Sequence, residues 1–152
     1  MKSLLLLFCF FSFSYSEQYT FLVNKYDKEI ELEAKIIANI AISSVNENIK
    51  LFIPEISNNE KKIYSKFFTL VNTCSNANFV FVKKTIKISP SCNQDKKIFF
   101  TNNYRRLLKE PIYIGAFFWS KSRPNITFIK DRLIQQNVKL SNDYKKFIED
   151  IK

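Results

Sequence analysis

Few residues of this chain can carry catalysis, and several catalytic arrangements are excluded because an essential residue type is missing. The chain has no histidine, which excludes a Ser-His-Asp triad, a Cys-His pair and an imidazole-based zinc site. Its single glycine, Gly115, excludes the glycine-rich loops that bind nucleotide phosphates. Paired carboxylates are the remaining option, but Asp131, Asp143 and Glu149 lie in charged helical patterns that favour a solvated surface. We therefore expect a protein that is not an enzyme, with no catalytic residue, metal ligand or cofactor.

The first sixteen residues have the pattern of a secretory signal peptide. A basic start precedes the apolar run Leu4–Phe13, and Ser14 and Ser16 occupy the small-residue positions before a cut. The apolar run is too short to cross a bilayer, and a retained N-terminal anchor is the alternative interpretation. We therefore expect an exported protein with a signal peptide at 1–16 and a single domain at 17–152.

Removal of the signal peptide would leave two cysteines, Cys74 and Cys92. An even number of cysteines in an exported protein favours a disulfide. The runs Phe79–Val82 and Thr85–Ile88 lie between them, and if these runs are adjacent strands, their outer ends would bring the cysteines within bonding distance. A metal-binding pair is the weaker interpretation because the chain has neither histidine nor a CxxC motif.

The chain is basic, with a formal net charge of +10. Such a balance can favour nucleic acid, acidic lipid headgroups or an acidic protein partner. We do not expect nucleic acid, because exported proteins rarely meet it and arginine-rich or glycine-aromatic RNA-binding motifs are missing. The abundance of Lys, Asn, Ile and Phe is also typical of codon bias in an AT-rich genome. The lysines are spread along the chain, as in Lys61-Lys62, Lys83-Lys84, Lys96-Lys97 and Lys145-Lys146.

Strands and helices alternate along the predicted domain. A helix is expected from Asp27, and a second helix is expected to follow Asn58 and to end at Cys74. Tyr19–Val23 fits either an extended lead or the start of the first helix. This alternation predicts an α/β three-layer sandwich with a mixed sheet. The apolar stripes of the helices are Ile30, Ala34, Ile37, Ala41 and Val45, then Ile63, Phe67, Leu70 and Val71; the strands are expected at Asn48–Ile53, Phe79–Val82 and Ile98–Thr101, with a helical turn over Asn102–Leu108.

A β-hairpin is expected next, followed by two helices. Its strands are the apolar runs Ile112–Trp119 and Ile126–Ile129, which flank a polar break. The first helix is predicted over Asp131–Gln136, and the last continues from Ser141 to the C-terminus.

Within the hairpin, three successive aromatic residues are either core or an exposed binding patch. Phe117 and Trp119 should share one face of the strand, with Phe118 on the other. Phe117, Trp119 and Arg123 are the candidate partner-contact residues. We expect Phe118→Ala to unfold the domain and Trp119→Ala to weaken partner binding. Arg123 and Arg132 are candidates for holding an anion, although solvated charge is the simpler interpretation.

The C-terminal third resembles the end of YfiR-like periplasmic proteins. That family ends in a hairpin with a Gly-Arg turn, a short helix, a Gly-Leu-Lys-Ile-Ser-type step and a last helix. Here Ser122 and Asn137 stand in place of the two glycines. The resemblance covers 112–148 and, more sparsely, 30–83. It is carried by Ile114–Trp119, Arg123, Ile126–Ile129, Arg132-Leu133 and Asn137–Ser141, and earlier by Ala34–Ile40 and by Cys74 before Phe79–Val82.

The resemblance implies a non-enzymatic regulator in the periplasm. The characterised type represses a membrane diguanylate cyclase by binding its periplasmic domain. A membrane signalling protein, either a diguanylate cyclase or a sensor kinase, is therefore the implied partner. The alternative is an accessory or scaffold subunit of a secretion or flagellar complex. A small-ligand binding protein is less expected because no convergent polar cluster is visible, and a homodimer is left open.

Overall fold

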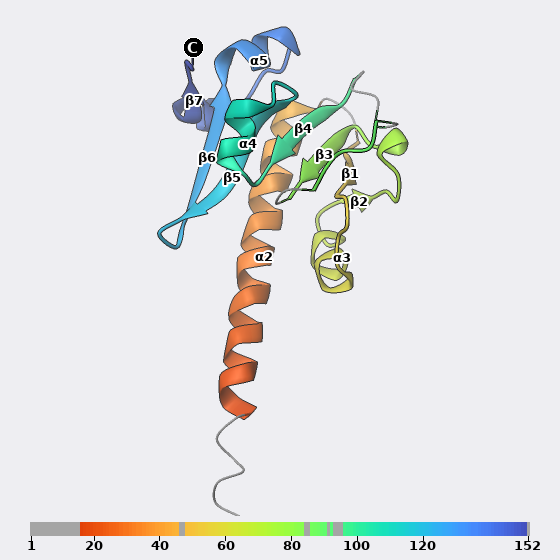
Figure 1. Cartoon of the computed structure of the whole chain (residues 1–152), viewed down its shortest axis with the longest axis vertical. Helices are drawn as coiled ribbons and strands as arrows, with labels where there is room; N and C mark the ends of the chain where they lie inside the picture. Colours follow the sequence, from red (N-terminus) through yellow and green to blue (C-terminus); the bar gives the residue numbers. More distant parts are fainter. Residues whose placement is uncertain (1–15, 46–47, 84–85, 91, 93–95, 152) are drawn as a thin grey trace, which may run out of the picture.

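A seven-stranded mixed sheet forms the centre of the protein, with strand order β2-β1-β3-β4-β5-β6-β7 (Figure 1). The first five strands in this order are parallel, β6 is antiparallel to β5, and β7 is parallel to β6. The expected single-domain α/β fold with a mixed sheet is therefore confirmed. The computed structural model describes residues 16–45, 48–83, 86–90, 92 and 96–151. The strands are Lys50–Phe52 (β1), Thr69–Leu70 (β2), Phe79–Val82 (β3), Ile98–Thr101 (β4), Tyr113–Ser120 (β5), Arg123–Ile129 (β6) and Ile148–Glu149 (β7).

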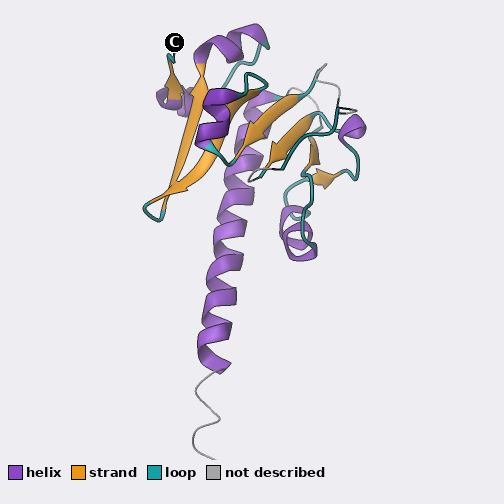
Figure 2. Cartoon of the chain, viewed as in Figure 1, coloured by secondary structure: helices purple, strands orange, loops and turns teal. Residues whose placement is uncertain are grey.

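Helix α2, Ser16–Ser44, packs on one face of the sheet, and its N-terminal half extends beyond the sheet (Figure 2). Its buried residues recur every three or four positions, which is the predicted apolar stripe. They pack against strand residues of the same face in one continuous core. The buried stripe consists of Ile30, Ala34, Ile37, Ala38, Ile40 and Ala41.

The start of α2 differs from the sequence-based expectation. The helix begins at Ser16 rather than at Asp27, so Tyr19–Val23 belongs to it and Asp27 is not its N-cap. Instead, Asp27 Oδ1 accepts a hydrogen bond of 2.7 Å from Asn59 Nδ2 on α3. The predicted signal peptide lies outside the described residues except for Ser16. In the part of the chain that the structure describes, no helix has the length and hydropathy needed to cross a bilayer.

Helix α3, Asn58–Tyr64, packs beside α2 and is shorter than predicted. It begins with a capping box, in which Ser57 and Glu60 bond each other's backbone N–H groups. The expected helix to Cys74 is wrong, because the chain turns at Ser65 and enters β2. The aromatic and β-branched residues of Phe67–Val71 suit a strand better than a helix. A single 3₁₀ turn, Cys74–Asn76, follows before β3.

The opposite face of the sheet is covered by the crossover from β3 to β4 and by helix α4, Tyr104–Lys109. The predicted strand Thr85–Ile88 is wrong, because Ile86–Ser89 has no strand pairing. The crossover connects two neighbouring parallel strands, so it has to return along a face of the sheet rather than pair as a hairpin. The core on this face is formed by Ala77, Val80, Val82, Cys92, Phe99, Leu107, Tyr113, Ala116 and Ile129.

The β5–β6 hairpin contains the only glycine of the chain where there is no room for a side chain. A Cβ atom on Gly115 would lie 2.5 Å from the Phe100 ring and 2.6 Å from the Thr127 carbonyl oxygen. The pairing of β4 with β5 shifts register beside it, since Phe99 pairs with Tyr113 but Phe100 pairs with Gly115. This glycine therefore allows the hairpin to pack closely against β4.

The C-terminal segment follows the prediction only at first. Helix α5, Lys130–Gln135, is close to the predicted helix, and Asn137 ends it with a φ of 51°. The expected last helix is wrong: a 3₁₀ helix, Asn142–Phe147, leads into the short edge strand β7. The reason is packing, because Tyr144 stacks edge-on against Phe128 and β7 pairs with the end of β6.

Candidate functional site

The carboxyl ends of the parallel strands form the edge at which a functional site is expected. In open α/β sheets, ligands bind outside this edge at the point where the strand order reverses. Here the reversal lies between β1 and β3, since β2 is placed outside β1. Three features meet this carboxyl edge: the start of α3 after β1, Lys83 after β3, and the turn of the β5–β6 hairpin after β5.

The hairpin turn consists of two residues, Lys121 and Ser122, with φ values of 48° and 59°. Ser120 and Arg123 pair across it, which is the geometry of a tight two-residue hairpin. Positive φ at both positions normally favours Gly, Asn or Asp. The turn is exposed and projects the end of the hairpin away from the core (Figure 1).

The three aromatic residues of the hairpin lie in different environments. Phe117 is fully buried, Phe118 is half-buried against Tyr104 at a ring distance of 5.1 Å, and Trp119 is 37% exposed. Phe117 and Trp119 share one face, as predicted, with ring centroids 5.7 Å apart in an edge-to-face contact. Arg123 is exposed beside the turn.

The structure therefore corrects one candidate contact residue. Phe117 cannot be reached by a partner, because its ring belongs to the core beneath α2. Trp119 and Arg123 remain accessible, and Pro124, the cross-strand neighbour of Trp119, is also exposed. We call Trp119, Arg123 and Pro124 the hairpin surface.

A buried cluster of charged groups lies at the reversal point itself. Lys83 Nζ is 2.5 Å from Glu33 Oε1 and 2.8 Å from Glu60 Oε1. The Tyr64 hydroxyl donates a hydrogen bond of 2.6 Å to the same Glu33 oxygen. The ammonium group also lies 5.3 Å from the centre of the Tyr64 ring. We call Lys83, Glu33, Glu60 and Tyr64 the ion cluster.

Three separate elements position the ion cluster. Glu33 lies on the buried stripe of α2, between Ile30 and Ala34. Glu60 is the third residue of α3, where its second carboxylate oxygen accepts hydrogen bonds from Ser57. Lys83 immediately follows the fully buried strand β3. The cluster therefore joins both helices of this face to the end of a central strand.

The pKa values of Lys83 and Glu60 are both shifted in the direction that favours the charged form. Burial alone would lower the pKa of Lys83, but Glu33 and then Glu60 outweigh it and raise this pKa. Burial would raise the pKa of Glu60, but hydrogen bonds from Lys83 and Ser57 outweigh it and lower this pKa. Burial and the charge of Glu33 raise the pKa of Tyr64 well above its ordinary value. Lys83 is therefore a protonated donor and not a nucleophile at neutral pH.

The ion cluster was not predicted from the sequence, although two signals were present. Glu33 interrupts an otherwise apolar helical stripe, and Lys83 directly follows an all-apolar strand. A charged residue at such a position requires a buried partner of opposite charge. The charged groups of the cluster are therefore paired with one another at the reversal point.

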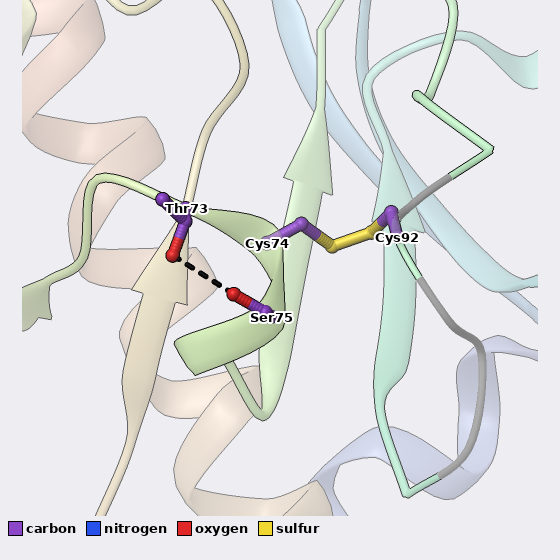
Figure 3. Close-up of a disulfide and its surroundings, with 4 residues drawn as sticks. All are labelled: Thr73, Cys74, Ser75 and Cys92. Atoms are coloured by element: carbon purple, nitrogen blue, oxygen red, sulfur yellow. Dashed lines mark hydrogen bonds between the residues drawn. A yellow bond between two sulfur atoms is a disulfide. The ribbon is translucent and has the colours of Figure 1, made fainter.

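The predicted disulfide between Cys74 and Cys92 is confirmed (Figure 3). It joins the 3₁₀ turn before β3 to the crossover after β3, with the Cα atoms 5.3 Å apart. The predicted reason, two adjacent strands, is wrong, because the crossover reaches Cys74 by running back along the face of the sheet. Hydroxyl groups of Thr73 and Ser75 lie 3.1 Å apart beside the bond (Figure 3).

The two arginines considered for anion binding have different environments. Arg132 Nη1 donates hydrogen bonds of 2.7, 3.0 and 2.8 Å to the carbonyl oxygens of Leu107, Glu110 and Tyr113. It therefore caps the carboxyl end of α4, whereas Arg123 is exposed. Among the described residues, no group of three or more Cys, Asp or Glu side chains is arranged to hold a metal ion.

Comparison with family models, with curated proteins and with solved structures finds no match to this chain.

Proposed function

We propose that this protein is an exported, non-enzymatic regulator that controls a membrane signalling partner by direct contact through the hairpin surface. The partner would be a protein of the diguanylate cyclase or sensor kinase type, with a domain in the periplasm. The resemblance of 112–148 to YfiR-like proteins supports this proposal. Ser122 and Asn137, which stand at the two glycine positions of that family, both have positive φ, as glycine replacements at such positions require.

The single observation that carries the proposal is the contrast between the reversal point and the hairpin turn. At the reversal point the ion cluster is buried and its groups are paired with one another. At the hairpin turn, by comparison, Trp119 is 37% exposed beside an exposed arginine and proline. Exposed Trp and Arg side chains are the residue types that most often anchor protein interfaces. This edge therefore favours protein contact over ligand turnover.

Photo-crosslinking in the producing cell tests this function. A photoreactive amino acid at position 119 should capture a membrane protein with a periplasmic domain. The same amino acid at Ile134 is the matched control, because Ile134 is an apolar residue with 67% exposure on α5, away from the hairpin turn. Capture of secretion or flagellar components would support the scaffold alternative instead. Equal capture of the same proteins from both positions would contradict a specific hairpin surface.

The expected export has its own measurement. Mass spectrometry of the protein from the cell envelope should find a mature chain that starts at Glu17. A protein that retains Met1 would contradict cleavage of the predicted signal peptide.

A further inference from the structure

Two segments that pack on opposite faces of the sheet differ in charge. Residues 84–112, which form the crossover, β4 and α4, contain seven Lys and Arg side chains and two Asp and Glu side chains. Residues 17–66, which contain α2, β1 and α3, have seven Lys side chains and eight Asp and Glu side chains. Helices α2 and α4 lie on opposite faces of the sheet (Figure 1). Residues 84–112 therefore carry a formal charge of +5 and residues 17–66 a formal charge of −1.

The outer side of α4 combines basic residues with an exposed leucine. Leu107 is buried in the core, whereas Arg105, Leu108 and Lys109 are exposed. These three residues are spaced by three and four positions, so they share one side of the helix. Leu108, with 43% exposure, lies between the two charges along the chain.

The crossover extends this surface with a further exposed lysine, Lys87. Lys87 lines an open cavity of about 680 Å³ together with Arg106 and Glu110. Glu110 is the acidic residue of the described part of 84–112, and its carboxylate is already bound to Arg106 Nε at 2.8 Å. The exposed cations of this face are therefore not neutralised by that carboxylate.

We propose that this basic face, formed by Lys87, Arg105, Leu108 and Lys109, binds the anionic headgroups of a phospholipid surface. Lysines spread over a broad surface suit the delocalised attraction of a charged membrane, and an exposed leucine can enter the boundary between headgroups and acyl chains. Bidentate recognition of individual carboxylates on an acidic protein favours arginine over lysine. Here Arg106 already donates hydrogen bonds to Glu110 and to the Ile86 carbonyl oxygen.

This contact would hold the protein against the membrane on which its proposed partner lies. The hairpin surface is at the carboxyl edge of the sheet, whereas the basic face covers one side of it, so both can be occupied together. The inference rests on the proposed export, which brings the protein to a membrane surface. It does not depend on the identity of the partner, because vesicle binding needs no partner.

Co-sedimentation of the purified mature protein with vesicles tests the proposal. We expect binding to vesicles that contain phosphatidylglycerol, much weaker binding to pure phosphatidylcholine, and loss of binding at high salt. Arg105→Glu/Lys109→Glu should weaken binding to the anionic vesicles at least tenfold. Lys25→Glu/Lys28→Glu makes the same change in charge at exposed positions of α2, and it should change binding less than twofold. Leu108→Ser should weaken binding severalfold.

Three outcomes would overturn this inference. The first is no binding of the wild-type protein to anionic vesicles. The second is equal loss in the α4 and α2 double variants, which would show an effect of net charge alone. The third is an Arg105→Glu/Lys109→Glu variant that binds vesicles like the wild type but no longer captures a protein partner. That result would make this face a protein interface. Circular dichroism confirms that each variant is folded, and Trp119→Ala should bind vesicles like the wild type, which separates this test from that of the proposed function.

Discussion

The two faces of the sheet differ in where their charged side chains lie. On the α2 face, Lys83 and Glu33 are buried, Glu60 is half-buried, and Lys83 is bound to both glutamates beneath α2 and α3. On the α4 face, Lys87, Arg105 and Lys109 stay at the surface, and one short helix and a disulfide-bonded crossover form the cover. In a chain-entropy estimate, closing a loop of 18 residues contributes about 3 kcal/mol to stability. Buried charge therefore organises one face, and a covalent bond helps to organise the other.

Breaking the ion cluster should have the largest effect on stability. Lys83→Met removes the cation that is bound to the buried Glu33 and the half-buried Glu60, and loss of one partner from a buried ion pair costs about 3–5 kcal/mol. The matched change on the other face, Lys87→Met, removes an exposed lysine and should change stability by less than about 0.5 kcal/mol. Urea unfolding measures both variants. A cost below about 1 kcal/mol for Lys83→Met would show that the cluster does not hold this face together.

Phe117 and Phe118 point to opposite faces of β5, so truncating each of them compares how much the two faces contribute to stability. Phe117 points into the core on the α2 face and is fully buried, so Phe117→Ala should cost about 3–5 kcal/mol. Phe118 packs against the core on the α4 face and is only half-buried, so Phe118→Ala should cost less. Urea unfolding of both variants is the measurement. A larger loss in Phe118→Ala would agree with the sequence-based expectation and contradict the burial seen in the structure.

Acid should destabilise the protein through protonation of Glu60 on the α2 face, by less than the substitutions above. The pKa of Glu60 is lowered below its ordinary value of 4.5, so the unfolded chain takes up this proton first. The stability that Glu60 contributes is therefore present above about pH 4.5 and is lost as the pH falls through the lowered pKa. The stability that Lys83 contributes is present below about pH 10.5 and is lost as the pH rises through the raised pKa of Lys83.

Urea unfolding between pH 3 and pH 7 tests the acid limb. Glu60→Gln should flatten the loss of stability below pH 4.5, whereas Glu55→Gln, at an exposed position, should leave its shape unchanged. An identical acid limb in the wild type and in Glu60→Gln would contradict the role of this carboxylate.

The fold could be predicted where the local pattern and the tertiary contacts agree. The stripe of α2, strands β3 and β4, the hairpin and α5 were predicted because their apolar periodicity matches their final burial. The segment after Tyr64 was wrongly predicted as helix because Ile63, Phe67, Leu70 and Val71 also fit a helical period. Pairing of β2 with β1 overrides that period, and a pairing of this kind is not visible in the local sequence.

The candidate site was predictable only in part. The exposure of Trp119 and Arg123 agrees with their choice as contact residues, but the burial of Phe117 depends on how α2 packs and could not be inferred from strand alternation alone. The ion cluster joins residues 33, 60 and 83, which are far apart in the chain. Only the fold brings them together, so the sequence could indicate unusual charges but not their pairing.

The affinity of the protein for its crosslinked partner tests directly whether the hairpin surface is the contact site. Trp119→Ala should weaken binding at least tenfold while its melting temperature stays within a few degrees of the wild type, because interface aromatic anchors carry a large share of binding energy. The matched variant Ile134→Ala, which also removes an exposed apolar side chain, should bind like the wild type. Wild-type affinity in Trp119→Ala, or equal losses in both variants, would contradict the assignment of the hairpin surface as the contact site.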